Sequence, residues 1–198
     1  GEAFDYLIGE RTLPSADRAA RAAAALLLLA RHPVLSVNGN VAALVPSEIA
    51  DLADAVDADV EVNLFNRTDE RVAAIAEHLR DHGVVDVKGL TADARIPGLS
   101  HKRAKVDADG IADADVVVVP LEDGDRAAAL KAVGKREIVI DLNPLTRSAQ
   151  AATVPVVDNV IRAVPNITRH ARDLRDAPRE RLERVVAEFD PQSALDEA

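Results

Sequence analysis

Short apolar runs alternate along the chain with longer segments in which apolar residues recur every three or four positions. The runs are typical of β-strands and the longer segments of amphipathic helices. The runs predict strands at 34–38, 60–65, 84–88, 115–121, 137–141 and 154–157. The periodic segments predict helices at 15–31, 47–57, 67–82, 125–134, 145–152, 159–172 and 178–189. We expect Ser15 to cap the first helix with its hydroxyl oxygen.

Alternation of strands and helices is typical of βαβ units, in which crossover helices join parallel strands. The run DVVVV at 115–119 is apolar on both faces, as in a central strand that helices cover on both sides. The segment 89–112 has no clear period. We therefore predict one α/β domain of three layers over residues 1–190, with a mostly parallel sheet and helices on both faces. A frayed tail is expected at 191–198.

Ligands of such sheets bind beyond the carboxyl ends of the strands. Polar and turn-forming residues follow five of the predicted strands there, in the groups 38–40, 66–68, 122–126, 141–148 and 158–159. Each group alone is typical of turns and helix caps. Their coincidence at one edge of the sheet indicates a ligand site.

Two common nucleotide-binding signatures are absent from the sequence. No two glycines are spaced G-x-G, and the pair Gly134-Lys135 has Ala129 where a P-loop needs glycine. A phosphate would then be held by helix N-termini and arginines. Asn38-Gly39-Asn40 fits that role through close backbone approach at Gly39 and amide donors on both sides. The alternative is a plain Asn-Gly turn.

Acidic residues gather around Gly124 at a predicted helix start. Glu122, Asp123 and Asp125 could hold Mg²⁺ through oxygen ligands and waters. The alternative is that acids at a helix N-terminus favour the helix dipole. Arg126 beside them could meet a phosphate or pair with its neighbours.

Basic residues gather in the loop 93–105, at Arg95, Lys102, Arg103 and Lys105. The loop could close over an anionic substrate, or be a solvated loop or a subunit contact. His78 and His82 have the i, i+4 spacing of a metal-binding pair on a helix, but the metalloprotease glutamate is missing. We favour a structural role for both, near the helix C-terminus.

Composition and charge exclude several classes of protein. The chain has no Cys, which excludes a disulfide scaffold, a thiol nucleophile and an iron–sulfur site. Its net charge of −10 disfavours nucleic acid and an anionic membrane as partners. The chain has 22 Asp against 12 Glu and 5 Lys against 19 Arg. This balance favours a halophilic protein, and a GC-rich genome is the alternative.

Several long blocks share their residues and order with one family. From Gly1 to about Asp173 they read GEAFDYLIGE, AAAALLLLARHPVLSVNGNVAALVPSEI, VEVNLFNRT, DARIPGL, VPLEDGDRAAAL, IVIDLNPLTRSAQAA and VVDN. In these blocks the chain resembles archaeal phosphopantothenate synthetase, also called 4-phosphopantoate–β-alanine ligase. The resemblance implies a Rossmann-like cytoplasmic homodimer of coenzyme A synthesis. It would join 4-phosphopantoate to β-alanine with ATP and Mg²⁺ through an acyl-adenylate, releasing AMP and diphosphate.

The resemblance also implies where ATP binds. The family's ATP contacts fall on residues of the predicted strand ends: Asp141, Leu142, Asn143, Arg147, Ser148, Asn159 and Val160. Further ATP-contacting arginines belong to a segment that we expect to precede Gly1, because the chain has no Met. No residue is an obvious base for the attack by the β-alanine amine. A nucleotide-binding regulator without catalysis is the alternative function, and the missing glycine fingerprint counts against a redox enzyme.

Overall fold

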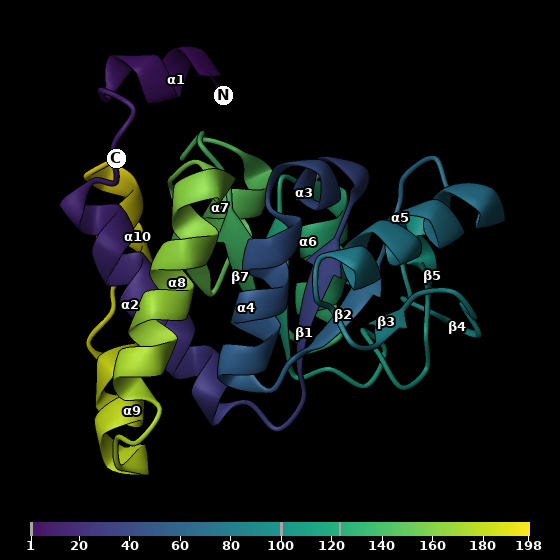
Figure 1. Ribbon diagram of the computed structural model, residues 1–198. Helices are drawn as coiled ribbons and strands as arrows, with labels where there is room; N and C mark the ends of the chain where they lie inside the picture. The colour runs from purple at the N-terminus through teal and green to yellow at the C-terminus, as the bar shows by residue number, and fades with distance from the viewer. Residues whose placement is uncertain (1, 100, 123) are drawn as a thin grey trace.

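The computed structural model describes residues 2–99, 101–122 and 124–198 (Figure 1). Its main sheet has six strands in the order β3-β2-β1-β6-β7-β8, and every neighbouring pair is parallel. The strands are β1 (Pro33–Val37), β2 (Asp59–Val62), β3 (Val87–Lys88), β6 (Val116–Pro120), β7 (Arg136–Ile140) and β8 (Val154–Val156). All five residues of β1 and of β6 are buried, because these central strands are covered on both faces. The predicted parallel α/β fold is confirmed.

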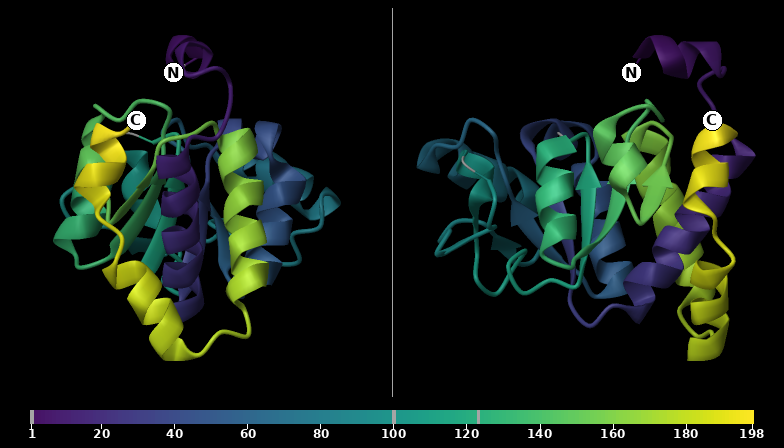
Figure 2. Two further views of the ribbon diagram at one scale, coloured as in Figure 1. Left: turned by 90° about the vertical axis from the view of Figure 1, so that its left-hand side faces the viewer. Right: turned by 180° about the vertical axis from the view of Figure 1, so that it is seen from behind.

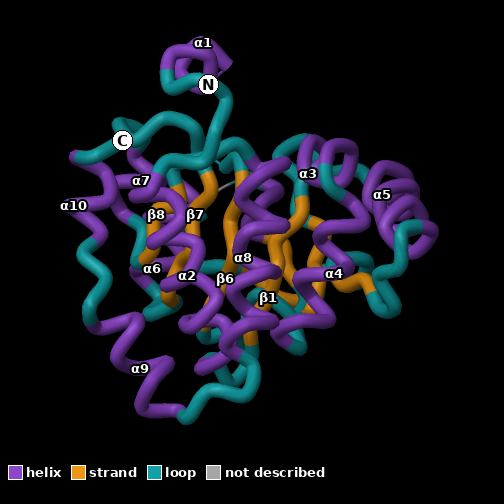
Figure 3. Tube along the Cα trace, turned by 60° about the vertical axis from the view of Figure 1, so that its left-hand side comes forward, coloured by secondary structure: helices purple, strands orange, loops and turns teal. Residues whose placement is uncertain are grey.

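Helices cover both faces of the sheet. The helices are α1 (Glu2–Leu7), α2 (Pro14–Leu29), α3 (Gly39–Leu44), α4 (Pro46–Val56), α5 (Asp69–Asp81), α6 (Gly124–Ala132), α7 (Arg147–Ala151), α8 (Val160–Leu174), α9 (Arg179–Ala187) and α10 (Pro191–Asp196). α2, α4, α5 and α8 bury their apolar sides in one core, on the face that Figure 3 brings forward. α6 lies on the other face, seen from behind in Figure 2, over a smaller core that includes Val117, Val139 and Leu130.

The segment 89–112 forms a small unit of its own. Ala94–Arg95 (β4) and Lys105–Val106 (β5) pair as antiparallel strands, with a 3₁₀ turn at Lys102–Ala104 (η1) before β5. Ile96 and Val106 are buried against the smaller core. The unit therefore depends on tertiary contacts, which explains why its sequence has no period.

Two predictions about the ends of the chain are wrong. The tail is helical from Pro191 to Asp196 rather than frayed, because Ala194 and Leu195 are buried and α10 packs on α2 and β8. Ser15 does not cap α2, because the helix begins one residue earlier at Pro14 and Ser15 is buried within it. Among the residues that the structure describes, no helix has the length and apolar character needed to cross a membrane.

Candidate active site

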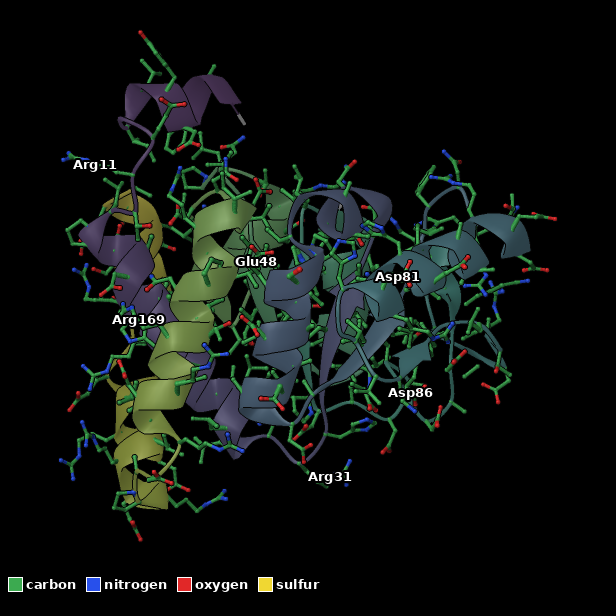
Figure 4. All side chains as sticks on the ribbon, in the orientation of Figure 1. Arg11, Arg31, Glu48, Asp81, Asp86 and Arg169 are labelled. Carbon is green, nitrogen blue, oxygen red and sulfur yellow. The ribbon has the colours of Figure 1, made fainter. Side chains whose placement is uncertain are left out.

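The chain leaves the neighbouring central strands β1 and β6 in opposite directions. β1 connects through α3 and α4 to β2, whereas β6 connects through α6 to β7 on its other side. A parallel sheet has a crevice at such a reversal, outside the carboxyl ends of the two strands. Arg31 and Asp86 precede β1 and β3 and mark the opposite, amino-terminal edge in Figure 4. The crevice therefore lies at the edge near α3 and α7 in Figure 1.

Asn38 fastens the two loops that flank this crevice. Its Nδ2 donates to the carbonyl oxygens of Pro120 (3.1 Å) and Leu121 (3.2 Å). Its Oδ1 accepts from the backbone N–H groups of Asn40 and Val41, which caps the short helix α3. The side chain that we predicted to contact substrate is therefore committed to the scaffold. A Cβ on Gly39 would meet Ile75 Cδ1 at 3.8 Å, an ordinary contact, so space does not require a glycine there.

A pocket of about 160 Å³ opens between these loops and α5, and we call it the β1–β6 pocket. It is lined by Asn38, Gly39, Asn40, Leu64, Phe65, Asn66, Arg71, Arg103 and Leu121. Its volume is below the ~300–1,000 Å³ of sites for drug-sized ligands. The pocket therefore suits a small acid or one charged end of a molecule, and its two arginines favour an anion.

The two arginines of the β1–β6 pocket come from different elements. Arg71 extends from the first turn of α5, and its Nη1 donates to the carbonyl oxygen of Asn66 at 2.7 Å. Arg103 comes from η1 and forms an ion pair with Glu122. The guanidinium carbon of Arg103 lies 5.1 Å from the centre of the Phe65 ring, within cation–π range. The basic loop thus supplies one cation, Arg103, to the pocket. The sequence analysis did not single out the second cation, Arg71.

Two arginines that we predicted as phosphate contacts lie elsewhere. Arg126 is fully buried, and its Nη1 donates to Ser36 Oγ (2.9 Å) and Glu122 Oε2 (2.8 Å). Its burial and these two contacts fit the alternative of pairing with its neighbours. Arg95 is exposed on β4, opposite Lys105, and does not line the β1–β6 pocket.

Two of the acidic residues around Gly124 form ion pairs with different arginines. The Glu122 carboxylate lies between Arg103 and Arg126, and Asp125 Oδ1 pairs with Arg147 Nη1 at 2.8 Å on the surface. Asp123 lies outside the described residues. Residues 2–99, 101–122 and 124–198 contain no group of three or more acidic or histidine side chains able to hold a metal ion. The magnesium site at Asp123 and Asp125 stays a prediction, and Glu122 does not fit it.

The two helix histidines make structural contacts. His78 Nε2 donates to the carbonyl oxygen of Ala42 (3.1 Å) and His82 Nδ1 to that of His78 (2.8 Å). The two rings pack with their centres 4.3 Å apart. These contacts join α5 to α3 and end α5, as the structural interpretation predicts.

The turn after β7 is ordered by its own side chains. Asp141 accepts from the backbone N–H of Asn143 (3.0 Å) and from Thr146 Oγ1 (2.9 Å). Asn143 Oδ1 in turn accepts from the N–H of Leu145 (3.0 Å). Leu142, between Asp141 and Asn143, is buried, with 9% of its surface exposed. The turn therefore presents a fixed backbone at the carboxyl end of β7.

Residues at the start of α7 connect this turn to the loop after β6. Ser148 is buried, and its Oγ donates to the carbonyl oxygen of Glu122 at 2.8 Å. Arg147 is exposed, and its Cβ packs so closely on Gly124 that a Cβ there would lie 2.5 Å away. Contact at this distance requires glycine at 124. The loops after β6 and β7 therefore form one surface.

The end of β8 is held by a network that joins it to α1. Asn159 caps α8 through the N–H of Ile161 (3.2 Å), and its Nδ2 donates to Asp5 Oδ2 (3.0 Å). Arg162 hydrogen-bonds to Asp5 and to the buried carboxylate of Asp158. Hydrogen bonds from Arg162 lower the pKa of Asp5. This network keeps α1 near the strand ends (Figure 1).

Comparison with known proteins decides the family. A sequence model described as phosphopantothenate/pantothenate synthetase matches residues 15–198. The chain belongs to the phosphopantothenate/pantothenate synthetase family. It is 56% identical to the 4-phosphopantoate–β-alanine ligase of Thermococcus kodakarensis, over 96% of the chain and 73% of that protein. It is 59% identical to the ligase of the same name from Methanospirillum hungatei, over 88% of the chain and 71% of that protein. The Thermococcus onnurineus ligase is 57% identical over the whole chain and 76% of its own length.

The carboxyl edge of the sheet brings together most of the residues that the sequence singled out. The groups at 38–40, 121–122, 141–148 and 158–160 follow four neighbouring strands there. The sequence singled out Arg103 and Ser148 but did not predict that both contact Glu122, because they reach it from segments that are distant in the chain. Asp158 was among the polar residues that follow the predicted strands, but the sequence analysis gave it no separate role.

A larger hollow of about 450 Å³ lies away from the strand ends, between α2, α9 and α10. Its two arginines, Arg18 and Arg21, are offset by acidic residues, and Arg18 pairs directly with Glu197. The hollow therefore has no charge preference for an anionic substrate. The β1–β6 pocket is the better candidate for one.

Proposed function

We propose that this protein is an ATP-dependent ligase of archaeal coenzyme A biosynthesis. It joins 4-phosphopantoate to β-alanine and forms 4′-phosphopantothenate, AMP and diphosphate. The names of the relatives support this reaction. The structural support is the arginine-lined β1–β6 pocket, because the loop after β6 that borders it accepts a hydrogen bond from Ser148 at the start of α7.

The nucleotide would lie across the ends of β7 and β8. The residues proposed to hold it are Asp141, Leu142, Asn143, Arg147, Ser148, Asn159 and Val160. Arg147 suits the triphosphate, since its guanidinium is exposed at the surface, where it pairs with Asp125. The N-terminus of α8, a helix of 15 residues, also favours an anion. The Asp141–Thr146 turn provides a fixed backbone edge beside them.

The acid, 4-phosphopantoate, would lie in the β1–β6 pocket, next to the loop after β6 that also contacts Ser148 of the proposed nucleotide site. Arg71 and Arg103 would neutralise its negative charges, and Asn40 and Asn66 would add neutral polar contacts. A carboxylate and a triphosphate repel each other, so charge neutralisation and alignment supply most of the rate enhancement. Mg²⁺ would add to that neutralisation when bound, and Asp123 and Asp125 remain its proposed ligands.

The reaction proceeds in two transfers. A carboxylate oxygen of 4-phosphopantoate attacks the α-phosphorus of ATP, and the bond to the diphosphate breaks. The amine of β-alanine then attacks the acyl carbon of the adenylate, and AMP leaves with the bonding electrons while the amine loses a proton. Arginines serve the first transfer because no side-chain nucleophile takes part in it.

The family resemblance further supports a homodimer and a cytoplasmic location, and the many aspartates support adaptation to high salt. A nucleotide-binding regulator remains the alternative function, on the same strand ends. Calorimetry separates the two proposals, because ATP affinity would be unchanged by 4-phosphopantoate in a regulator.

The direct test is product analysis with the purified full-length protein. We expect AMP only when ATP, 4-phosphopantoate and β-alanine are all present, in a buffer with Mg²⁺ and high potassium chloride. Formation of ADP, or turnover without β-alanine, would contradict the ligase proposal.

A further inference from the structure

Glu122 lies in the loop between the β1–β6 pocket and the proposed nucleotide residues. Leu121 before it has φ +52°, a left-handed conformation that residues other than glycine and asparagine rarely adopt. Its peptide is held in place by bonds from its N–H to Ile140 O (3.0 Å) and from Asn38 Nδ2 to its carbonyl oxygen. Such backbone conformations persist where the surroundings enforce them, often at functional sites. The loop thus directs the Glu122 side chain inward.

The Glu122 carboxylate is buried between two guanidinium groups. Its side chain is 2% exposed, and its Oε2 accepts from Nη1 of the fully buried Arg126 at 2.8 Å. Its Oε1 pairs with Nη1 of Arg103, whose side chain is 10% exposed and lines the β1–β6 pocket. Arg126 is anchored in turn by Ser36. One rigid cation therefore fixes the carboxylate, and the carboxylate fixes the second cation at the pocket.

The main chain of Glu122 makes a separate link to the nucleotide side. Its carbonyl oxygen accepts from Ser148 Oγ at 2.8 Å, and Gly124 packs against Arg147. The same residue thus touches elements of both proposed subsites through different atoms. Changes to its carboxylate leave the carbonyl contact with Ser148 in place.

We propose that Glu122 is a positioning residue that holds Arg103 in place for the acid. This inference rests on the proposed function and adds to it. Ion-paired arginines are ordered before the substrate arrives, so less side-chain entropy is lost on binding. Without the carboxylate, Arg103 loses one ion-pair partner that orients it over Phe65, and the acid binds more weakly. The nucleotide, held through Ser148 and Arg147, is unaffected.

The test is a double-mutant cycle on Glu122→Gln and Arg103→Gln in the full-length protein. Isothermal titration calorimetry measures dissociation constants for 4-phosphopantoate and for ATP separately, without turnover. We expect each single substitution to weaken acid binding by about 10- to 100-fold, as for a charge-assisted contact. The double variant should bind the acid no more weakly than Arg103→Gln alone, because Glu122 acts through Arg103. ATP affinity should stay within about twofold throughout.

Two further variants separate positioning from general stability. Glu137→Gln changes another buried glutamate, which contacts neither proposed subsite, and should leave both affinities unchanged. Glu122→Asp keeps the negative charge but shortens the side chain by one methylene, which draws the carboxylate away from Arg103. It should therefore also weaken acid binding, and it provides a second test if Glu122→Gln does not fold.

The outcomes distinguish this inference from the ligase proposal. Unchanged acid affinity in the folded Glu122 variants, independent effects in the cycle, or a parallel loss of ATP affinity would overturn the positioning role. If the cycle gives the expected affinities but the wild-type protein forms no AMP, the ligase reaction alone is contradicted. If the wild-type protein forms AMP but the variants do not show the expected acid affinities, the positioning role alone is contradicted.

Discussion

Glu137 on β7 should destabilise the protein as the pH rises, and glutamine at this position should relieve the effect. Glu137 is 1% exposed, and neither carboxylate oxygen has a hydrogen-bond partner among the described residues. Arg126 and Lys131 are the cations that favour its charge, but burial outweighs them and raises its pKa to about 8. In the unfolded chain, the same group titrates near its ordinary value of 4.5.

The raised pKa fixes the sign and size of the effect. Between pH 4.5 and about 8 the unfolded chain has lost the proton that the folded protein still holds, so stability falls as the pH rises. Each unit of pKa difference corresponds to about 1.4 kcal/mol. The wild-type protein should therefore lose about 2.5 kcal/mol between pH 5 and pH 7 through this group. Glu137→Gln has no charge to bury and should not show this loss.

Urea unfolding followed by circular dichroism, at pH 5, 6, 7 and 8 in one salt concentration, measures the difference. The stability of Glu137→Gln minus that of wild type should grow by about 2–3 kcal/mol from pH 5 to pH 7. A difference that is constant with pH would show that Glu137 titrates normally and would refute the reasoning.

Glu61 on the same face of the sheet provides a matched control. Burial also raises its pKa, to about 7, but its carboxylate accepts from the N–H groups of Ile111 (2.6 Å) and Asp107 (3.1 Å). In Glu61→Gln, an amide NH₂ would face one of these donors. This variant should therefore lose about 1–3 kcal/mol at pH 5, where Glu137→Gln changes little.

Three other substitutions test the ends of the strands and the tail. Asn143→Ala should weaken ATP binding in calorimetry without changing acid affinity, and unchanged nucleotide affinity would place the nucleotide elsewhere. Gly124→Ala puts a Cβ 2.5 Å from Arg147 Cβ, so it should lower the melting temperature and ATP affinity together; wild-type values would show that the loop yields at no cost. Leu195→Ala should lower the free energy of unfolding by about 2–3 kcal/mol, since Leu195 is buried with Val157 and Ala149. No loss of stability would mean that α10 does not pack in solution.

The repeating pattern of the sequence determined the six strands of the main sheet, most of the helices that cover it and the class of fold. The apolar run at 115–119 belongs to a strand buried on both faces, and the periodic segment at 159–172 belongs to α8. These features are local, because the spacing of apolar residues in a helix or strand can be recognised within one short segment of sequence. The predicted strands also placed the polar groups that follow them at one edge of the sheet, because parallel strands have their carboxyl ends at the same edge.

The tertiary structure alone decided how those polar groups are used. Arg126 follows Glu122 by four residues, yet its burial depends on Ser36 from β1 and on the core beneath α6. Arg103 and Ser148 reach Glu122 from 19 and 26 residues away. The helical tail depends on burial of Leu195 beside Val157. Each of these outcomes rests on contacts between distant segments, whose burial and pairing energies leave no periodic trace in the sequence.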